Sequence, residues 1–266
     1  MSRLSAAAVA ARKAARFPVV TAYDAPFARA AAAAGIDVIL VGDSLGMVVL
    51  GYDSTTPVEL EDMIRHAGAV VRGAPNAHVI VDLPFGTYEV SDAQAVENAI
   101  AIVKRSGGSS VKLEGAADNA ARIRAITGAG IPVCAHLGVL PQTAGMGTGF
   151  RRQRDRERLL HEAEAAANAG AFGIVLEMVD EALAVEITAR VPVVTIGIGS
   201  GGGTDGQVIV MHDVLGLYPE PPPFAKQYAT LGADAATALR TYADDVRSGA
   251  FPPARAARTD AAPYRG

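Results

Sequence analysis

Short apolar runs rich in Val, Ile and Leu recur along the chain, and a segment with helical character separates each run from the next. Residues 38–41 are apolar at every position, and Gly42, Asp43 and Ser44 follow them directly. A run without alternation is typical of a parallel strand that is buried on both faces. Runs of this kind place the expected strands at 17–22, 37–41, 78–83, 109–114, 131–137, 172–177, 191–196 and 208–212.

Eight strands that alternate with helices predict an α/β fold, the (β/α)8 TIM barrel. Between the seventh and eighth strands only residues 197–207 are available, so we expect the seventh helix to be very short or replaced by a loop. A doubly wound sheet is the alternative, but the strand count and the acids at successive strand ends favour the barrel. The other connections predict helices at 25–34, 57–73, 92–105, 118–128, 155–169, 181–189 and 233–247.

We expect a single barrel domain over 1–266, with an N-terminal helical extension at 1–16 and a flexible C-terminal tail at 250–266. The chain has 266 residues, half of them hydrophobic, which is enough to bury one large core. The N-terminal segment is rich in Ala and Arg and has no acids, as in a transit peptide, but an exposed helix is the favoured interpretation.

The overall charge and the cysteine count exclude several classes of protein. A formal net charge of −4 gives no general attraction to nucleic acid or to anionic membranes. No window has the uninterrupted apolar length of a membrane helix, so we expect a small-molecule partner and a cytoplasmic location. Cys134 is the only cysteine, which excludes an intrachain disulfide and a Cys-rich zinc site. It lies in an apolar run, and we interpret it as a core residue.

Charged side chains stand at the ends of several expected strands. All strands of a barrel run the same way, so their C-terminal ends meet around one mouth. Lys112 and Glu114 are two residues apart and therefore face the same side of their strand. The residues expected at the mouth are Asp43, Asp82, Lys112, Glu114, His136 and Glu177.

Three of these residues, Asp43, Asp82 and Glu114, are acids that would repel one another at close range. A hard divalent cation, Mg²⁺ or Mn²⁺, would relieve the repulsion and leave coordination positions for water or substrate. In the alternative interpretation each acid is hydrogen-bonded separately to loop amides, and Lys112 only neutralises Glu114.

A metal with open positions could chelate a 2-oxo acid and make the carbon next to its ketone more acidic. Glu177 ends a hydrophobic strand, where desolvation raises the basicity of a carboxylate, and is the best candidate for the base. Lys112 would pair with substrate charge or oxygen. His136 could donate to the substrate carboxylate or to an enolate oxygen, or it could be a structural hydrogen-bonding residue.

Two further patterns leave their function open. The glycine-rich stretch 197–203 lacks the Lys and Ser or Thr of a phosphate-binding loop, and we interpret it as a tight loop at the mouth. The basic cluster Arg151, Arg152 and Arg154 could receive an anionic cosubstrate, or it could be a solvated helix start.

Several long segments of the chain occur in the order and spacing of a known family. They are VTAYDAPFA, VGDSLGMVVLGYDSTTPV, RGAPNAHVIVDLPF, VKLEG, PVCAHLGVLPQ, VLEMV, VTIGIGSG and TDGQVIVMHDVLGL. On these segments, over 17–228, the chain resembles ketopantoate hydroxymethyltransferases. The resemblance implies a barrel of the phosphoenolpyruvate mutase and isocitrate lyase superfamily.

The resemblance also implies an activity and roles for particular residues. The activity is transfer of a hydroxymethyl group from 5,10-methylenetetrahydrofolate to 3-methyl-2-oxobutanoate, which forms ketopantoate for pantothenate and coenzyme A synthesis. By motif position, Asp43, Asp82 and Glu114 correspond to the Mg²⁺ ligands, and Glu177 to the proton-abstracting base. Asp43, Ser44, Asp82 and Lys112 correspond to residues that contact the 2-oxo acid. The family forms large homo-oligomers, commonly decamers.

One stretch departs from the family pattern. At 149–155 the chain reads GFRRQRD, with Arg151 and Arg152 and then Arg154 where the family has a Lys or Arg, a small apolar residue and a glycine. This difference bears on the geometry of the loop at the mouth, and therefore on how folate is used or on the size of substrate that fits. Two other hypotheses follow: a related Mg²⁺-dependent 2-oxo acid lyase or a hydroxymethyltransferase with another substrate, and a non-catalytic barrel that acts as a binding or assembly subunit.

Overall fold

The computed structural model describes residues 3–253. Its chain divides into two compact units, Met1–Met211 and His212–Gly266, and each is described by itself. The expectation of one domain over 1–266 stays a prediction. No helix in the described part of the chain combines the length and the apolar character that crossing a bilayer requires.

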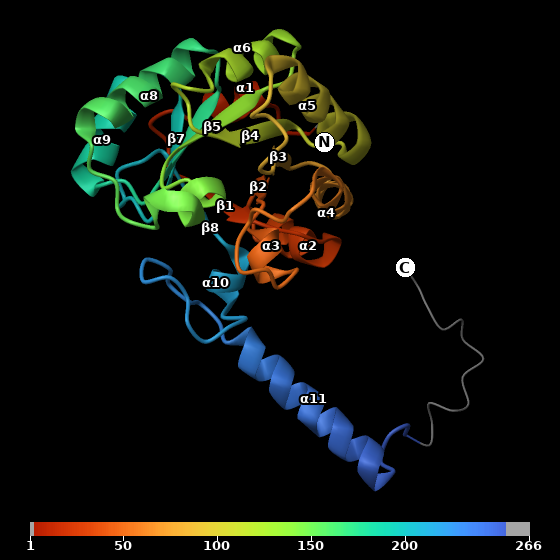
Figure 1. Cartoon of the computed structure of the whole chain (residues 1–266). Coiled ribbons are helices and arrows are strands. Elements are labelled where there is room, and N and C mark those ends of the chain that lie inside the picture. The colour runs from red at the N-terminus through yellow and green to blue at the C-terminus, as the bar shows by residue number, and fades with distance from the viewer. Residues whose placement is uncertain (1–2, 254–266) are drawn as a thin grey trace. The chain divides into compact units, whose positions relative to one another are not determined.

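Eight parallel strands form a closed barrel in the first unit (Figure 1). Each strand pairs with the next, and β1 pairs with β8, so the sheet has no edge. The expected (β/α)8 barrel is confirmed, and the doubly wound alternative is wrong. The strands are β1 (Phe17–Thr21), β2 (Val38–Val41), β3 (His78–Asp82), β4 (Ser110–Glu114), β5 (Val133–Gly138), β6 (Gly173–Glu177), β7 (Val194–Ile198) and β8 (Gly206–Ile209).

Helices cover the outside of the barrel, as Figure 1 shows for α5, α6, α8 and α9. Asp24, Ser91 and Asp155 begin three of the helices by accepting hydrogen bonds from backbone N–H groups of the first turn. The helix expected from residue 57 begins at Leu60, because the N–H of Glu59 donates to Oδ2 of Asp62. The helices are α2 (Ala25–Ala33), α4 (Leu60–Gly73), α5 (Asp92–Ser106), α6 (Ala120–Gly128), α8 (Arg156–Asn168) and α9 (Glu181–Arg190).

The connections at the strand ends differ in part from expectation. Among the described residues no helix lies between β7 and β8, as expected from the short connection. Three short helical segments were not expected: α3 (Leu45–Val48) after β2, and α7 (Pro141–Thr143) with the π-helix η1 (Ala144–Thr148) after β5. They occupy the two loops that carry most of the residues discussed below.

The N-terminal segment lies at the opposite end of the barrel, where the strands begin. The expectation of a helix over 1–16 is wrong in extent, because α1 covers only Ala6–Ala10 and Ala14 has a φ of 64°. Val9 is fully buried in the interior cluster. Lys13 pairs with buried Asp205 at 3.0 Å. Residues 1–2 lie outside the described range.

The barrel interior continues directly into the mouth. Ile80, Cys134 and Val175 belong to one buried apolar cluster. Side chains alternate along a strand, so the residues two positions further on also point inward. These are Asp82, His136 and Glu177. Cys134 is confirmed as a core residue, and burial raises the pKa of its thiol to about 12.

The helices of the last part of the chain are α10 (Met211–Leu215) and α11 (Leu231–Ser248). The expected strand at 208–212 is wrong at its C-terminal end, because β8 ends at Ile209 and His212 lies in α10. The helix expected at 233–247 is present as α11, and none of its residues is buried. Of the expected tail, residues 254–266 lie outside the described residues.

Candidate active site

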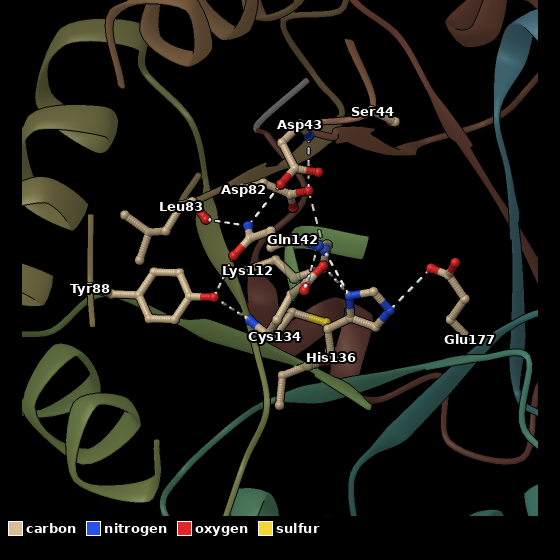
Figure 2. Close-up of polar contacts among 12 residues, drawn as sticks. Asp43, Ser44, Asp82, Leu83, Tyr88, Lys112, Cys134, His136, Gln142 and Glu177 are labelled. Carbon is tan, nitrogen blue, oxygen red and sulfur yellow. Dashed lines mark hydrogen bonds and ion pairs between the residues drawn. The ribbon is translucent and has the colours of Figure 1, made fainter. Parts of the chain in front are cut away.

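The structure brings together all the residues expected at the mouth, and Figure 2 labels all of them except Glu114. Asp82 ends β3, Lys112 and Glu114 come from β4, His136 from β5 and Glu177 from β6, and Asp43 follows β2. The register places Asp82 beside Lys112 and Glu114 beside His136. Each of these side chains except Glu177 is buried, and 19% of the Glu177 side chain is exposed. Glu177 is therefore the acid of the group most open to a substrate.

Asp82 is the centre of the first set of contacts. Its Oδ2 accepts a hydrogen bond from the N–H of Asp43 at 3.1 Å and lies 3.2 Å from Nζ of Lys112. Its Oδ1 is buried and has no hydrogen-bond partner among the described residues. A buried carboxylate oxygen without a donor is costly, so this atom is suited to an additional ligand.

Burial and neighbouring charge shift the pKa values of this group. Burial raises the pKa of Asp43 well above its usual value, and the charges of Asp82 and Glu114 raise it further. Burial also raises the pKa of Asp82, against the opposing effect of Lys112. The pKa of Lys112 is above its usual value, because the three acids outweigh its burial. Lys112 is therefore a permanent cation among acids that a further positive charge would stabilise.

His136 lies between two acids. Its Nδ1 is 3.3 Å from Oε1 of Glu114, and its Nε2 is 3.2 Å from Oε2 of Glu177, a charge contact without hydrogen-bond alignment. Burial and Lys112 lower the pKa of His136, but the two acids outweigh them and raise it to about 9. Nδ1 also lies 3.3 Å from Nζ of Lys112. A protonated ring cannot accept from Lys112, so Nδ1 donates to Glu114.

Gln142 was not expected from the sequence and makes the most extensive contacts in the site. Its Nε2 donates to Oδ2 of Asp43 at 2.7 Å and to the carbonyl of Leu83 at 2.9 Å, and its backbone N–H donates to Oε2 of Glu114 at 3.1 Å. Its Oε1 accepts from the hydroxyl of Tyr88 at 2.6 Å. Gln142 therefore connects Asp43, which follows β2, with Glu114 of β4, and Figure 2 shows its contact with Asp43.

Tyr88 determines which end of the Gln142 amide faces Asp43. The N–H of Glu114 donates to the Tyr88 oxygen at 3.3 Å, so the Tyr88 proton is directed to Oε1 of Gln142. This leaves the Nε2 protons for Asp43 and Leu83. No signal in residue type identified Gln142 or Tyr88, and only their positions in loops after strand ends could have done so.

Two further residues shape the mouth. Ser44 follows Asp43 and directly precedes α3. Its Oγ lies 2.9 Å from the hydroxyl of Tyr23. Gly138 has a φ of 100°, and a Cβ there would lie 2.1 Å from the carbonyl oxygen of Glu177. The close approach of β5 to β6 at this point requires glycine and helps to place Glu177.

The basic cluster after β5 has a structural role in part. Arg152 donates to the carbonyls of Val179 at 2.9 Å and Gly199 at 2.8 Å. Arg154 lies 3.8 Å from Asp180 and is largely exposed. Arg152 therefore holds the loop against the ends of β6 and β7. These contacts do not place a cosubstrate at the cluster.

The carboxylates at the mouth fit Mg²⁺, which completes its coordination with water and substrate, better than a metal ion whose ligands all come from the protein. Within 3–253, no group of three or more His, Cys, Asp and Glu side chains has the geometry of a complete metal site. Mg²⁺ is commonly bound by one or two carboxylates together with water and substrate. The unpartnered Oδ1 of Asp82 and the carboxylate of Asp43 supply such donors. Glu114 is held by Gln142 and His136, and its role as a third ligand stays a prediction.

Comparison with known proteins supplies the identity of the fold and of the family. Among solved structures, the chain is similar to 2,3-dimethylmalate lyase, described as a member of the PEP mutase/isocitrate lyase superfamily, with a TM-score of 0.61 and 18% identity over 99% of this chain and 93% of that one. Phosphonopyruvate hydrolase gives a TM-score of 0.63 and 14% identity, covering 97% and 92%. At these identities the likeness shows the fold alone.

The sequence relatives are much closer. The 3-methyl-2-oxobutanoate hydroxymethyltransferase of Aeropyrum pernix is 54% identical over 237 residues, which cover 88% of this chain and 86% of the relative. The protein of that name from Deinococcus radiodurans is 50% identical over 240 residues, covering 88% and 84%. The family model described as ketopantoate hydroxymethyltransferase matches residues 3–254. The chain therefore belongs to the ketopantoate hydroxymethyltransferase family of enzymes.

Proposed function

We propose that the chain transfers a hydroxymethyl group from 5,10-methylenetetrahydrofolate to 3-methyl-2-oxobutanoate and so forms 2-dehydropantoate (ketopantoate). The relatives described above are named for this 2-oxo acid. The observation that carries the proposal is the arrangement of two kinds of acid around His136. Asp82 and Glu114 are buried in the floor of the mouth, whereas Glu177 is partly open. This is the difference expected between acids that hold charge and an acid that takes a proton.

The residues on the floor would bind and orient the 2-oxo acid. Lys112 is a buried cation beside Asp82 and can pair with the substrate carboxylate or keto oxygen. Ser44, next to Asp43, offers a hydroxyl at the same mouth. Asp43 and Asp82, with Glu114 as the expected third ligand, would hold Mg²⁺. When bound there, the cation would polarise the keto group and lower the pKa of the C3 proton.

Glu177 would then remove the proton from C3 of the bound 2-oxo acid, and C3 would form the new bond to the one-carbon unit. Overall, the C3–H bond breaks, a C3–C bond forms, water supplies the hydroxyl oxygen and tetrahydrofolate leaves. His136 is 3.2 Å from Glu177 and carries positive charge near neutral pH. It would orient the Glu177 carboxylate before proton transfer.

The other expectations complete the proposal. We expect a cytoplasmic enzyme of pantothenate and coenzyme A synthesis. We also expect a homo-oligomer, such as a decamer, and the apolar side chains Leu239, Tyr242 and Val246, which are exposed on α11, support this expectation. No specific observation favours the lyase hypothesis. The non-catalytic hypothesis is not retained, because the chain belongs to an enzyme family.

Proton exchange at C3 of 3-methyl-2-oxobutanoate in deuterated water, followed by NMR, tests this proposal. We expect exchange that depends on Mg²⁺, and ketopantoate once methylenetetrahydrofolate is added. Glu177→Gln should reduce exchange by at least about 10²-fold, the usual contribution of a positioned base. Exchange at the wild-type rate in this variant would show that Glu177 is not the base. Exchange without product would indicate a different second substrate.

A further inference from the structure

A pocket beside the candidate active site has no role in the contacts described so far. It has a volume of about 260 Å³ and lies between the loop after β2 and the loop after β5. Met47 and residues 53–56 form one side, and Pro141, Gly145, Met146 and Phe150 form the other. The volume is below the roughly 300–1,000 Å³ of most small-molecule sites and suits one ring system rather than a large ligand.

The pocket adjoins the floor of the mouth. Oγ1 of Thr56 donates to the carbonyl of Gln142 over 3.5 Å, and Nε2 of Gln142 contacts Asp43. Met47, on α3, is about one helical turn beyond Asp43. A ligand in the pocket would therefore lie next to the place where a 2-oxo acid is activated.

The apolar part of the pocket is unusually exposed. Met47, Met146 and Phe150 are 43%, 59% and 60% exposed, from two loops that are far apart in sequence. Large apolar side chains grouped around one opening are typical of a surface that a ligand covers. Methionine sulfur and a phenyl ring both pack well against the face of a flat aromatic ring.

The polar part of the pocket indicates which ligand it suits. Thr55 lines the pocket and is only 2% exposed, yet its Oγ1 has no hydrogen-bond partner among the described residues. Asp53 lines the same pocket and is exposed. A carboxylate beside a free hydroxyl favours a ligand edge with N–H groups, and it repels the carboxylate of a 2-oxo acid.

We propose that this pocket binds the pteridine ring of the folate cosubstrate, with Asp53 and Thr55 at its hydrogen-bonding edge and Met47, Met146 and Phe150 against its faces. The inference rests on the proposed function, because it assigns a site to the second substrate of that reaction. A pteridine carries an amino group next to a ring N–H, a pair that one carboxylate can accept together. The glutamate end of folate is anionic and would extend out of the pocket, away from Asp53.

Three substitutions test the assignment in the full chain with Mg²⁺. Asp53→Asn and Thr55→Val remove hydrogen-bonding capacity with little change in size, and Phe150→Ala removes an apolar face. Asp118→Asn is the matched control, since Asp118 is an exposed acid after β4 that does not line the pocket. Tetrahydrofolate binding is measured by anaerobic calorimetry, and C3 exchange is measured without folate.

We expect Asp53→Asn to raise the Kd for tetrahydrofolate and the KM for methylenetetrahydrofolate by about ten-fold or more, and Thr55→Val and Phe150→Ala to raise them less. C3 exchange without folate should stay within about two-fold of wild type, since the pocket does not hold the 2-oxo acid. Asp118→Asn should change neither quantity.

Unchanged folate parameters in Asp53→Asn and Thr55→Val would overturn the assignment. An equal loss of C3 exchange would also overturn it, because the pocket would then serve the 2-oxo acid. If the wild-type chain shows no exchange, the proposed function fails, and tetrahydrofolate binding still decides the pocket. Binding that Asp53→Asn weakens would support the pocket assignment, whereas a wild-type chain that does not bind tetrahydrofolate would refute it.

Discussion

The side-chain amide of Gln142 donates to Oδ2 of Asp43 across 2.7 Å, although the two residues are 99 positions apart in the sequence. The donor and acceptor in this contact are fixed by a chain of hydrogen bonds through Tyr88 and Gln142. The chain begins at the N–H of Glu114, which can only donate, and ends at the carbonyl of Leu83, which can only accept. Between these ends, Tyr88 can only donate to Gln142, and Gln142 can only donate to Asp43. The loop after β5 therefore determines how Asp43 faces the mouth.

Gln142→Glu tests this positioning. The substitution replaces a donor by an acid of the same shape beside Asp43, so we expect Asp43 to turn away and C3 exchange to fall by about 10²-fold. We also expect a change in the Mg²⁺ concentration that gives half-maximal exchange. The Kd for Mn²⁺, measured by electron paramagnetic resonance, should change as well. Tyr88→Phe, which removes only the group that orients the amide, should give a smaller change in the same direction. Wild-type metal binding in both variants would contradict the positioning role.

Gly138→Ala should displace Glu177. A Cβ would lie 2.1 Å from the carbonyl oxygen of Glu177, and φ of 100° is unfavourable for alanine. We expect a loss of stability of about 2–4 kcal/mol and a lower exchange rate in the folded protein. Gly128→Ala is the control, because nothing lies within 4 Å of its Cβ position in α6. It should raise stability by about 0.5–1 kcal/mol. Denaturant unfolding and C3 exchange check both variants.

Removal of Mg²⁺ should lower both activity and stability. A ligand that binds only the folded state stabilises it by about 2.7 kcal/mol at a hundred times its Kd. We expect EDTA to abolish C3 exchange and to lower Tm, and added Mg²⁺ to restore both. In Asp82→Asn, which alters the carboxylate with the unpartnered oxygen, Mg²⁺ should no longer raise Tm. A Mg²⁺-dependent Tm equal to that of wild type would remove Asp82 from the metal site.

His78 begins β3, at the end of the barrel opposite the mouth. Its titration should make the free energy of unfolding depend on pH. Burial lowers the pKa of His78 to about 4, and the ring contacts the carbonyl of Leu4 and the hydroxyl of Ser110. The unfolded chain therefore takes up this proton more readily. The contribution of neutral His78 to the free energy of unfolding is fully present above about pH 6.5. It is lost as the pH falls toward 4, and the total loss is about 3 kcal/mol.

Urea unfolding of wild type and His78→Gln between pH 7.5 and 5 measures this effect. The wild type should lose more stability on acidification than the variant, because Gln does not titrate. Parallel losses would show that other groups cause the acid sensitivity.

The barrel itself could be predicted from local pattern. Strands such as β2 and β3 are apolar at successive positions, and their period and spacing need no knowledge of distant residues. The same alternation places Asp82 two residues beyond Ile80 and Glu177 two beyond Val175, so the inward direction of these acids followed from the strand. Predictions that depended less on local pattern were less accurate. The predicted N-terminal helix is longer than the observed α1, and the predicted eighth strand continues to His212, beyond the observed end of β8.

The sequence by itself thus determined the barrel and the set of charged side chains at its mouth, because strand period and strand direction are local properties of the chain. Only the tertiary structure decided that Gln142 and Tyr88 orient Asp43, that Gly138 lies against Glu177, and that Thr55 and Phe150 share a pocket. These relationships depend on how loops from different strands fold over the same opening. Such loop conformations are determined by contacts between residues far apart in sequence, and no periodic pattern records them.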